Sequence, residues 1–119
     1  MPRDRFDYTL LDPDDPFEID KGNRPHLYAH LPANATGQQV AVGVEDIYEA
    51  YLGVPRFYEA DQQGDADWLM LGEVPGTLVI SVPLAPPKSG EHNRCRPIGL
   101  YGAVRRLRER YLRDVRWVA

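Results

Sequence analysis

Arginines and histidines are the side chains of this chain whose types and spacing most clearly indicate chemistry. Residues 94–119 contain 8 arginines against 2 acids, a formal charge of +6, whereas residues 1–93 contain 6 bases against 16 acids, a charge of −10. Arginine presents a planar, permanently charged fork that suits bidentate contacts to phosphate. The C-terminal part therefore indicates a phosphate-rich ligand, or else a solvated helix face that pairs with the acidic front of the same fold.

Two pairs of these side chains are spaced so that their members lie together. Arg94 and Arg96 point to the same side of a strand because side chains alternate along it, which predicts two adjacent guanidinium groups facing a phosphate. His26 and His30 are four residues apart and share one face of a helix. An imidazole changes its charge near neutral pH, so His30 is a candidate base or acid.

Each of these groups also has a structural interpretation. Arg94 and Arg96 could instead pair with Glu73 or Asp67 across the sheet. The two histidines could form a solvated pair or pack under the N-terminal residues, and His92 is expected to be exposed in a loop. Three further aromatic residues are expected to belong to the core instead of stacking on bases, namely Tyr48, Tyr51 and Trp68.

Hydrophobic periodicity predicts the elements that position these groups. Strands are expected at residues 17–20, 68–74, 77–82 and 94–99, and Pro75-Gly76 joins the middle two into a hairpin. Helices are expected at residues 24–31, 44–52 and 101–114. The last helix is amphipathic, with an arginine face and an apolar stripe that is expected to face the sheet, made of Leu100, Val104, Leu107 and Tyr111.

This order of elements predicts an α+β fold with a small antiparallel sheet, formed by a single domain at residues 16–119 behind an N-terminal arm at residues 1–15. No run approaches the roughly 20 apolar residues that span a bilayer, and the N-terminus lacks the apolar run of a secretory signal, so a cytoplasmic protein without a membrane partner is expected. Cys95 is the single cysteine and has no Cys or paired His at metal-ligand spacing. No metal and no cofactor are therefore expected.

Several short motifs, in the same order along about 100 residues, resemble the BrnT-type ribonuclease toxins. That family typically has Phe-Glu-Trp-Asp, a Lys-His pair, a Val-x-Phe-Glu-Glu-like helix start, a hydrophobic strand ending in Gly, and Arg-Ile-Ile-Ser-Ala-Arg-x-Ala before a basic helix. The corresponding segments here are FEID at 17–20, AH at 29–30, VGVED at 42–46, DWLMLG at 67–72 and RPIGLYGA at 96–103.

The resemblance implies a RelE-like fold, metal-free RNA cleavage and a small ribbon-helix-helix antitoxin as protein partner. Such cleavage needs a base for the 2′-hydroxyl, cations for the phosphorane and an acid for the leaving oxygen. The candidate catalytic residues are His30, Arg94, Arg96 and Tyr101. The candidate RNA-binding residues are His26, Arg105, Arg106 and Arg108.

Three departures from the family pattern keep a second class of function open. Ile19 stands at the aromatic position, Ala29 replaces the lysine before the histidine, and Tyr101 replaces the second arginine of the strand-to-helix motif. The alternative is a non-catalytic relative that binds RNA, ribosomes or a protein partner. A third possibility is a structural or regulatory protein whose arginine helix packs on an acidic partner.

Overall fold

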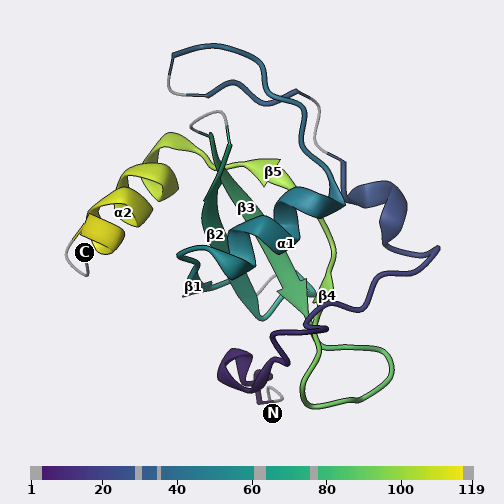
Figure 1. Ribbon diagram of the computed structural model, residues 1–119. Helices are drawn as coiled ribbons and strands as arrows, with labels where there is room; N and C mark the ends of the chain where they lie inside the picture. Colours follow the sequence, from purple (N-terminus) through teal and green to yellow (C-terminus); the bar gives the residue numbers. More distant parts are fainter. Residues whose placement is uncertain (1–3, 29–30, 35, 61–63, 76–77, 117–119) are drawn as a thin grey trace.

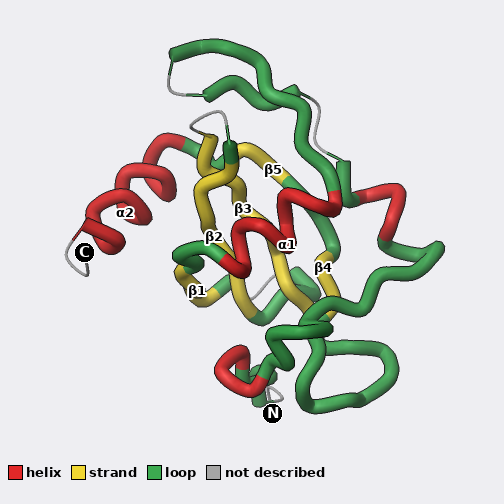
Figure 2. Tube along the Cα trace, viewed as in Figure 1, coloured by secondary structure: helices red, strands yellow, loops and turns green. Residues whose placement is uncertain are grey.

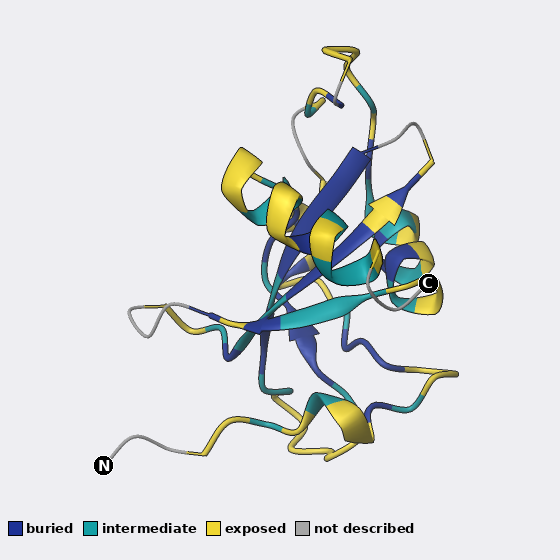
Figure 3. Ribbon diagram, turned by 90° about the vertical axis from the view of Figure 1, so that its left-hand side faces the viewer, coloured by how far each residue is buried: buried dark blue, intermediate teal, exposed yellow. Residues whose placement is uncertain are grey.

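Two α-helices lie on opposite faces of one antiparallel sheet in the computed structural model of the chain (Figures 1 and 3). The structure describes residues 4–28, 31–34, 36–60, 64–75 and 78–116. Its elements are, in chain order, the 3₁₀ turns η1 (Tyr8–Leu10) and η2 (Arg24–His26), α1 (Val44–Leu52), β1 (Arg56–Glu59), β2 (Trp68–Val74), β3 (Leu78–Ala85), β4 (Arg96–Pro97), β5 (Tyr101–Gly102) and α2 (Arg105–Arg116). The predicted α+β class is therefore confirmed.

A long hairpin forms the centre of the sheet. β2 and β3 pair in a register that runs from Trp68 opposite Leu84 to Val74 opposite Leu78. β1 continues the sheet beyond β2, while β4 and β5 pair with different parts of β3. The predicted strand at 68–74 is confirmed, and the strand predicted at 77–82 is confirmed for residues 78–82. Gly76 of the expected turn and residue 77 of the expected strand lie outside the described residues.

Both faces of the hairpin are covered, which explains its continuous apolar runs. Met70 and Ile80 belong to the larger core on the α1 side, whereas Leu71 and Val79 belong to a smaller cluster on the α2 side. Side-chain alternation along each strand divides the residues between the two faces. Gly72 allows α1 to approach closely, since a Cβ built there would lie 2.7 Å from Cβ of Ala50.

α1 begins and ends as predicted. The N–H of Gly43 donates to Oδ2 of Asp46 at 2.8 Å, and the N–H of Asp46 donates back to the carbonyl of Gly43 at 3.0 Å. Asp46 and Glu45 also complement the positive end of the helix dipole. Ile47 and Ala50 are buried, and Tyr48, Tyr51 and Trp68 pack against the same core as expected.

α2 differs from its prediction in its start and in its buried stripe. It begins at Arg105 because residues 101 and 102 pair with β3 as β5.

The buried stripe of α2 differs from the predicted one at two positions. Val104 is exposed, contrary to expectation, and Leu100 is buried in the core on the opposite face of the sheet. Tyr111 is buried and Leu107 half-buried as predicted, and Leu112 and Val115 complete the stripe. The outward side of α2 is exposed (Figure 3).

The predicted strands at 17–20 and 94–99 are largely wrong. Residues 96 and 97 alone form β4, and Phe17 makes a single parallel bridge to Cys95. Pro97 has no N–H to extend a ladder, which limits the strand at this edge. The backbone of Cys95 instead binds the preceding segment, since its N–H donates to the carbonyl of Pro16 and its carbonyl accepts from the N–H of Glu18.

The helix predicted at 24–31 is reduced to the three-residue turn η2, and residues 29 and 30 lie outside the described residues. Leu27 is fully buried, whereas Tyr28 and Leu31 on either side of the gap are exposed. Short helices in proteins are stabilised mainly by the apolar surface that they pack against the core. A longer helix here would bury little more apolar surface, so packing does not extend η2. The chain then runs as a loop above the sheet before α1 (Figure 2).

Residues 4–15, expected as an extended arm, pack against the sheet. The N–H of Phe6 donates to Oδ2 of Asp67, and Nε1 of Trp68 donates to the carbonyl of Phe6. Tyr8 stacks on Phe57 of β1, with ring centroids 4.3 Å apart. β1 itself was not predicted, because its four residues are too few to show a period.

The contact of Tyr111 with Val54 gives a test of how α2 is docked. The Tyr111 hydroxyl donates to the carbonyl of Val54 at 2.6 Å, and the ring is 2% exposed. Tyr111→Phe is expected to lower the free energy of unfolding by about 1 to 2 kcal/mol, because the carbonyl loses its partner. Tyr101→Phe is the control, since Tyr101 is exposed and should change stability by less than about 0.5 kcal/mol. Equal stabilities of the two variants in urea denaturation would contradict this docking.

Candidate functional site

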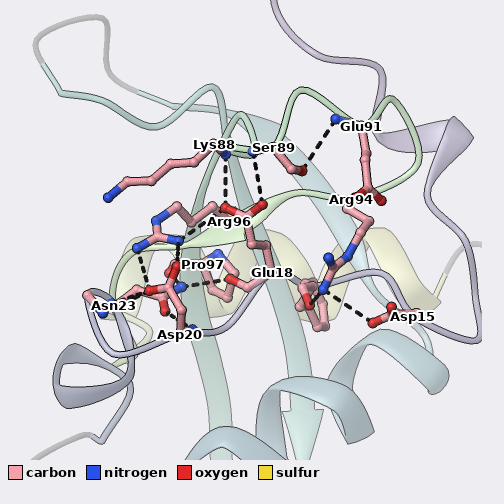
Figure 4. Close-up of polar contacts among 12 residues, drawn as sticks. Asp15, Glu18, Asp20, Asn23, Lys88, Ser89, Glu91, Arg94, Arg96 and Pro97 are labelled. Atoms are coloured by element: carbon pink, nitrogen blue, oxygen red, sulfur yellow. Dashed lines mark hydrogen bonds and ion pairs between the residues drawn. The ribbon is translucent and has the colours of Figure 1, made fainter.

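Arg96 is buried against two carboxylates (Figure 4). Its Nη1 lies 3.1 Å from Oε1 of Glu18 and 2.7 Å from Oδ2 of Asp20, and its Nη2 lies 2.8 Å from Oδ1 of Asp20. The Arg96 guanidinium, followed by the N–H of Gly22, holds the pKa of Asp20 well below its usual range. The bidentate contact with Asp20 is the main cause that raises the pKa of Arg96. This guanidinium is therefore already bound by protein carboxylates.

Glu18 and Asn23 extend this cluster to three segments of the chain. The carboxylate of Glu18 accepts from the N–H groups of Lys88 and Ser89 at 2.9 and 3.1 Å. Burial acts to raise the pKa of Glu18, but these hydrogen bonds and Arg96 outweigh it and lower the pKa. Nδ2 of Asn23 donates to the carbonyls of Glu18 and Pro97. The cluster thus joins residues 18–23, the loop at 88–89 and β4.

Arg94 also reaches the segment that precedes η2. Its Nη2 donates to the carbonyl of Phe17 at 2.9 Å and lies 3.5 Å from Oδ1 of Asp15. Arg94 and Arg96 therefore both point to residues 15–20, as Figure 4 shows. The two arginines bind acidic side chains and a carbonyl of this segment. These groups take the place of Glu73 or Asp67, the acids that were expected across the sheet. The side-by-side pair facing a phosphate that was predicted from the sequence is therefore replaced by separate contacts of each arginine with protein groups.

The outward face of α2 carries the exposed positive charge. The helix contains six arginines against Glu109 and Asp114. At 100° per residue, one face collects five of the arginines, whereas Arg108 falls beside the buried stripe and is half-buried. That outward face consists of Arg105, Arg106, Arg110, Arg113 and Arg116. Of the predicted RNA-binding arginines, Arg105 and Arg106 lie on it.

Both acids of α2 are engaged by neighbours. Glu109 accepts from Nε of Arg105 at 2.9 Å, and Asp114 accepts from the hydroxyl of Tyr58 at 2.6 Å. Burial, and then the bond to Asp114, raises the pKa of Tyr58 to about 12. Arg110 lies over the Tyr58 ring, 4.4 Å from its centroid. Within the described part of the chain, no carboxylate pairs with the other three arginines of the outward face, which are Arg106, Arg113 and Arg116.

A hollow lies between η2 and β5, and we call it the η2–β5 hollow. Pro25, His26 and Tyr28 line one side, and residues 98 and 100–102 line the other. Its volume is about 430 Å³. His26 and Tyr101, which sequence reasoning assigned to RNA binding and to catalysis, therefore border the same cavity. His30, the predicted base or acid, lies outside the described residues.

The structure thus divides the predicted site residues among three places. His26 and Tyr101 share the η2–β5 hollow, Arg94 and Arg96 bind residues 15–20, and the predicted arginines of α2 lie on that helix. Sequence reasoning missed Tyr28 and Arg116, and it placed Arg110 and Arg113 on the arginine face without listing them as RNA-binding residues. Arg116 lies beyond residue 114, where the helix was predicted to end, whereas α2 continues to Arg116.

In the residues that the structure describes, no three His, Cys, Asp or Glu side chains gather in a way that could hold a metal ion. Among the same residues, no helix has the length and apolar character needed to cross a bilayer.

Comparison with family models, curated proteins and solved structures finds no match. The function is therefore inferred from the surfaces described above.

The Arg96 cluster predicts a pH-dependent contribution to stability. Arg96→Met is expected to lower the free energy of unfolding by about 3 kcal/mol at neutral pH, because it leaves Glu18 buried without its cation. The pKa values of Glu18 and Asp20 are lowered in the folded chain, so their stabilisation is complete above the unfolded values near 4 and is lost as pH falls towards the folded ones. The difference between wild type and variant should shrink below about pH 4.

Urea denaturation at a series of pH values measures this difference. Arg105→Met is the matched control, because it breaks only the exposed pair with Glu109 and should leave the free energy of unfolding nearly unchanged. A difference between wild type and Arg96→Met that stays constant from pH 7 to pH 3 would contradict the role given to the two carboxylates.

Proposed function

We propose that this protein is a non-catalytic, RNA-binding relative of the BrnT-type toxins, and that the outward face of α2 binds the RNA backbone. The observation that supports it is the exposed arginine face, in which Arg106, Arg113 and Arg116 have no carboxylate partner within the described residues. Guanidinium groups held along one rigid helix suit the regularly spaced phosphates of a nucleic acid.

The start of α2 adds to this positive potential. The first turn contains Arg105 and Arg106 and no acid. Cations at that end oppose the helix dipole, whose positive pole is at the N-terminus, so the arrangement does not stabilise the isolated helix. An anion bound there would interact favourably with both the arginines and the dipole.

The contacts of Arg94 and Arg96 favour binding over cleavage. A catalytic cation must reach the charge that develops on the reacting phosphate. Arg96 is buried and holds two carboxylates, and Arg94 is half-buried against Asp15 and a carbonyl. Releasing either side chain would leave acidic groups without their partner, at a cost that a phosphate contact would have to exceed.

A second candidate function is that of a ribonuclease toxin with a RelE-like fold. The shared position of His26 and Tyr101 in the η2–β5 hollow favours it, because an imidazole and a phenol could exchange protons with a bound RNA. In that case a small ribbon-helix-helix antitoxin would cover the hollow and the outward face of α2. Either candidate would act on RNA in the cytoplasm.

RNA binding by α2 is tested through the salt dependence of affinity. Arg106→Ala/Arg113→Ala is expected to weaken binding to single-stranded RNA and to reduce the slope of log affinity against log salt by about 1.4, which is about 0.7 for each lost phosphate contact. Lys21→Ala/Lys88→Ala removes the same charge at exposed positions outside α2 and should leave the slope unchanged. Fluorescence anisotropy titrations at several salt concentrations measure both.

Equal slopes for the two double variants would contradict an RNA site on α2. Absence of RNA binding by the wild type at low salt would contradict the proposal altogether and favour an acidic protein partner for the same face.

Cleavage is tested separately by incubating the purified chain with labelled RNA and no metal. The non-catalytic function predicts intact RNA. The toxin function instead predicts cleavage that His26→Gln abolishes while RNA affinity is retained, because glutamine cannot transfer the proton. Cleavage that survives in His26→Gln would exclude this histidine as the proton-transfer group.

A further inference from the structure

We infer that the η2–β5 hollow receives one unstacked base of a single-stranded RNA, and this inference rests on the RNA binding proposed for α2. Two aromatic side chains at the hollow carry the inference. Tyr28 and Tyr101 are 56% and 59% exposed, far more than the other aromatic residues of this fold that pack in its core. Exposed aromatic rings are the usual platforms on which unpaired bases stack.

Each ring lies against a glycine, whose lack of a side chain allows this close approach and restricts the ring on that side. A Cβ built at Gly43 would lie 3.0 Å from Cε1 of Tyr28, and one built at Gly99 would lie 2.7 Å from Cε2 of Tyr101. Both rings therefore lie directly against the backbone while remaining largely exposed. Side chains that are already ordered lose less entropy on binding, which favours affinity.

The hollow also has the size and the chemistry of a base pocket. Its volume of about 430 Å³ lies in the range of small-molecule sites. Ile98 and Leu100 supply apolar surface, while the His26 ring can hydrogen-bond to the edge of a base. None of the described lining residues is a carboxylate, so none repels the adjoining phosphates. A base within a duplex stays in its stack, which makes the pocket selective for single strands.

The charge of α2 lies close enough to hold the backbone of the same strand. β5 leads directly into α2, and Arg105 follows Tyr101 by four residues, at most about 14 Å along a fully extended chain (Figure 1). A strand bound by the exposed arginines can therefore place a base in the hollow. This continuity with a positive surface identifies the occupant as a nucleic-acid base instead of an uncharged apolar ligand.

Tyr101→Leu tests the inference with an oligouridylate of about eight nucleotides as the probe. The variant is expected to bind it about tenfold more weakly, the loss of one stacked base, with an unchanged salt slope and an unchanged affinity for duplex RNA. Tyr101→Phe is the matched control, because it keeps the ring and should bind within about twofold of wild type. Thermal melting checks that both variants fold, as the exposure of Tyr101 leads us to expect.

Gly99→Ala provides a second variant that leaves the tyrosine in the chain. Its added methyl group would displace the Tyr101 ring, so it should lower affinity for the oligouridylate without altering the salt slope. Removing single bases from the oligonucleotide completes a double-mutant cycle. One abasic position should weaken binding to wild type but not to Tyr101→Leu.

The outcomes separate this inference from the function on which it rests. Wild-type affinity of Tyr101→Leu for the oligouridylate, or an equal loss for single-stranded and duplex RNA, would overturn the base pocket while leaving the α2 interface in place. A normal salt slope in Arg106→Ala/Arg113→Ala would instead overturn the α2 interface. Failure of the wild type to bind RNA would overturn both.

Discussion

The buried contact of Arg96 with Glu18 and Asp20 is the interaction on which the edge of this fold depends. β4 is only two residues long, and Pro97 removes one of its possible ladder hydrogen bonds. Main-chain pairing alone therefore holds this edge weakly. The guanidinium, together with the side chain of Asn23, ties the strand to residues 18–23 and, through Glu18, to the loop at 88–89. A charged side chain here performs the task that a longer strand performs in other sheets.

This use of arginine also determines which charges remain available outside. Residues 1–93 are acidic and residues 94–119 are basic, and the simplest expectation is that these two parts of the chain neutralise each other. Arg94 and Arg96 do so with Asp15, Glu18 and Asp20. α2 packs on the opposite face of the sheet from the α1 core, through Tyr111 and the stripe around it. Its outward arginines are exposed on the side turned away from the sheet, so their field is directed towards solvent.

The elements with a strong period could be predicted from the sequence. The β2–β3 hairpin and α1 have enough residues for alternation or helical spacing to appear, and the capping acids of α1 mark its start. Short elements could not be predicted in this way, because three or four residues in η2 or β1 carry no period. The start of α2 was misplaced since Leu100 and Val104 fit a helical spacing, although pairing of Tyr101 with Ser81 fixes that segment as a strand.

The candidate site could be predicted only as a set of residue types. Arg94 and Arg96 both reach residues 15–20, although the strand that predicted this is only two residues long, and their contacts with that segment join positions nearly 80 apart in the chain. No local pattern indicates that those arginines meet Asp15 and Asp20. The exposure of Tyr28 and Tyr101 is likewise a property of the folded surface, because an aromatic residue in a sequence is more often part of a core.

The position of Cys95 makes the edge of the sheet observable by chemical labelling. Its side chain is fully buried, its backbone binds Pro16 and Glu18, and burial raises the pKa of its thiol, so the reactive thiolate is scarce in the folded chain. A water-soluble thiol reagent can reach the sulfur only after the packing around Cys95 opens, and Phe17 of the segment that Cys95 binds belongs to that packing. The rate of alkylation therefore measures how often that local opening occurs. The single cysteine of the chain can thus be used to probe the stability of the segment that Arg96 holds in place.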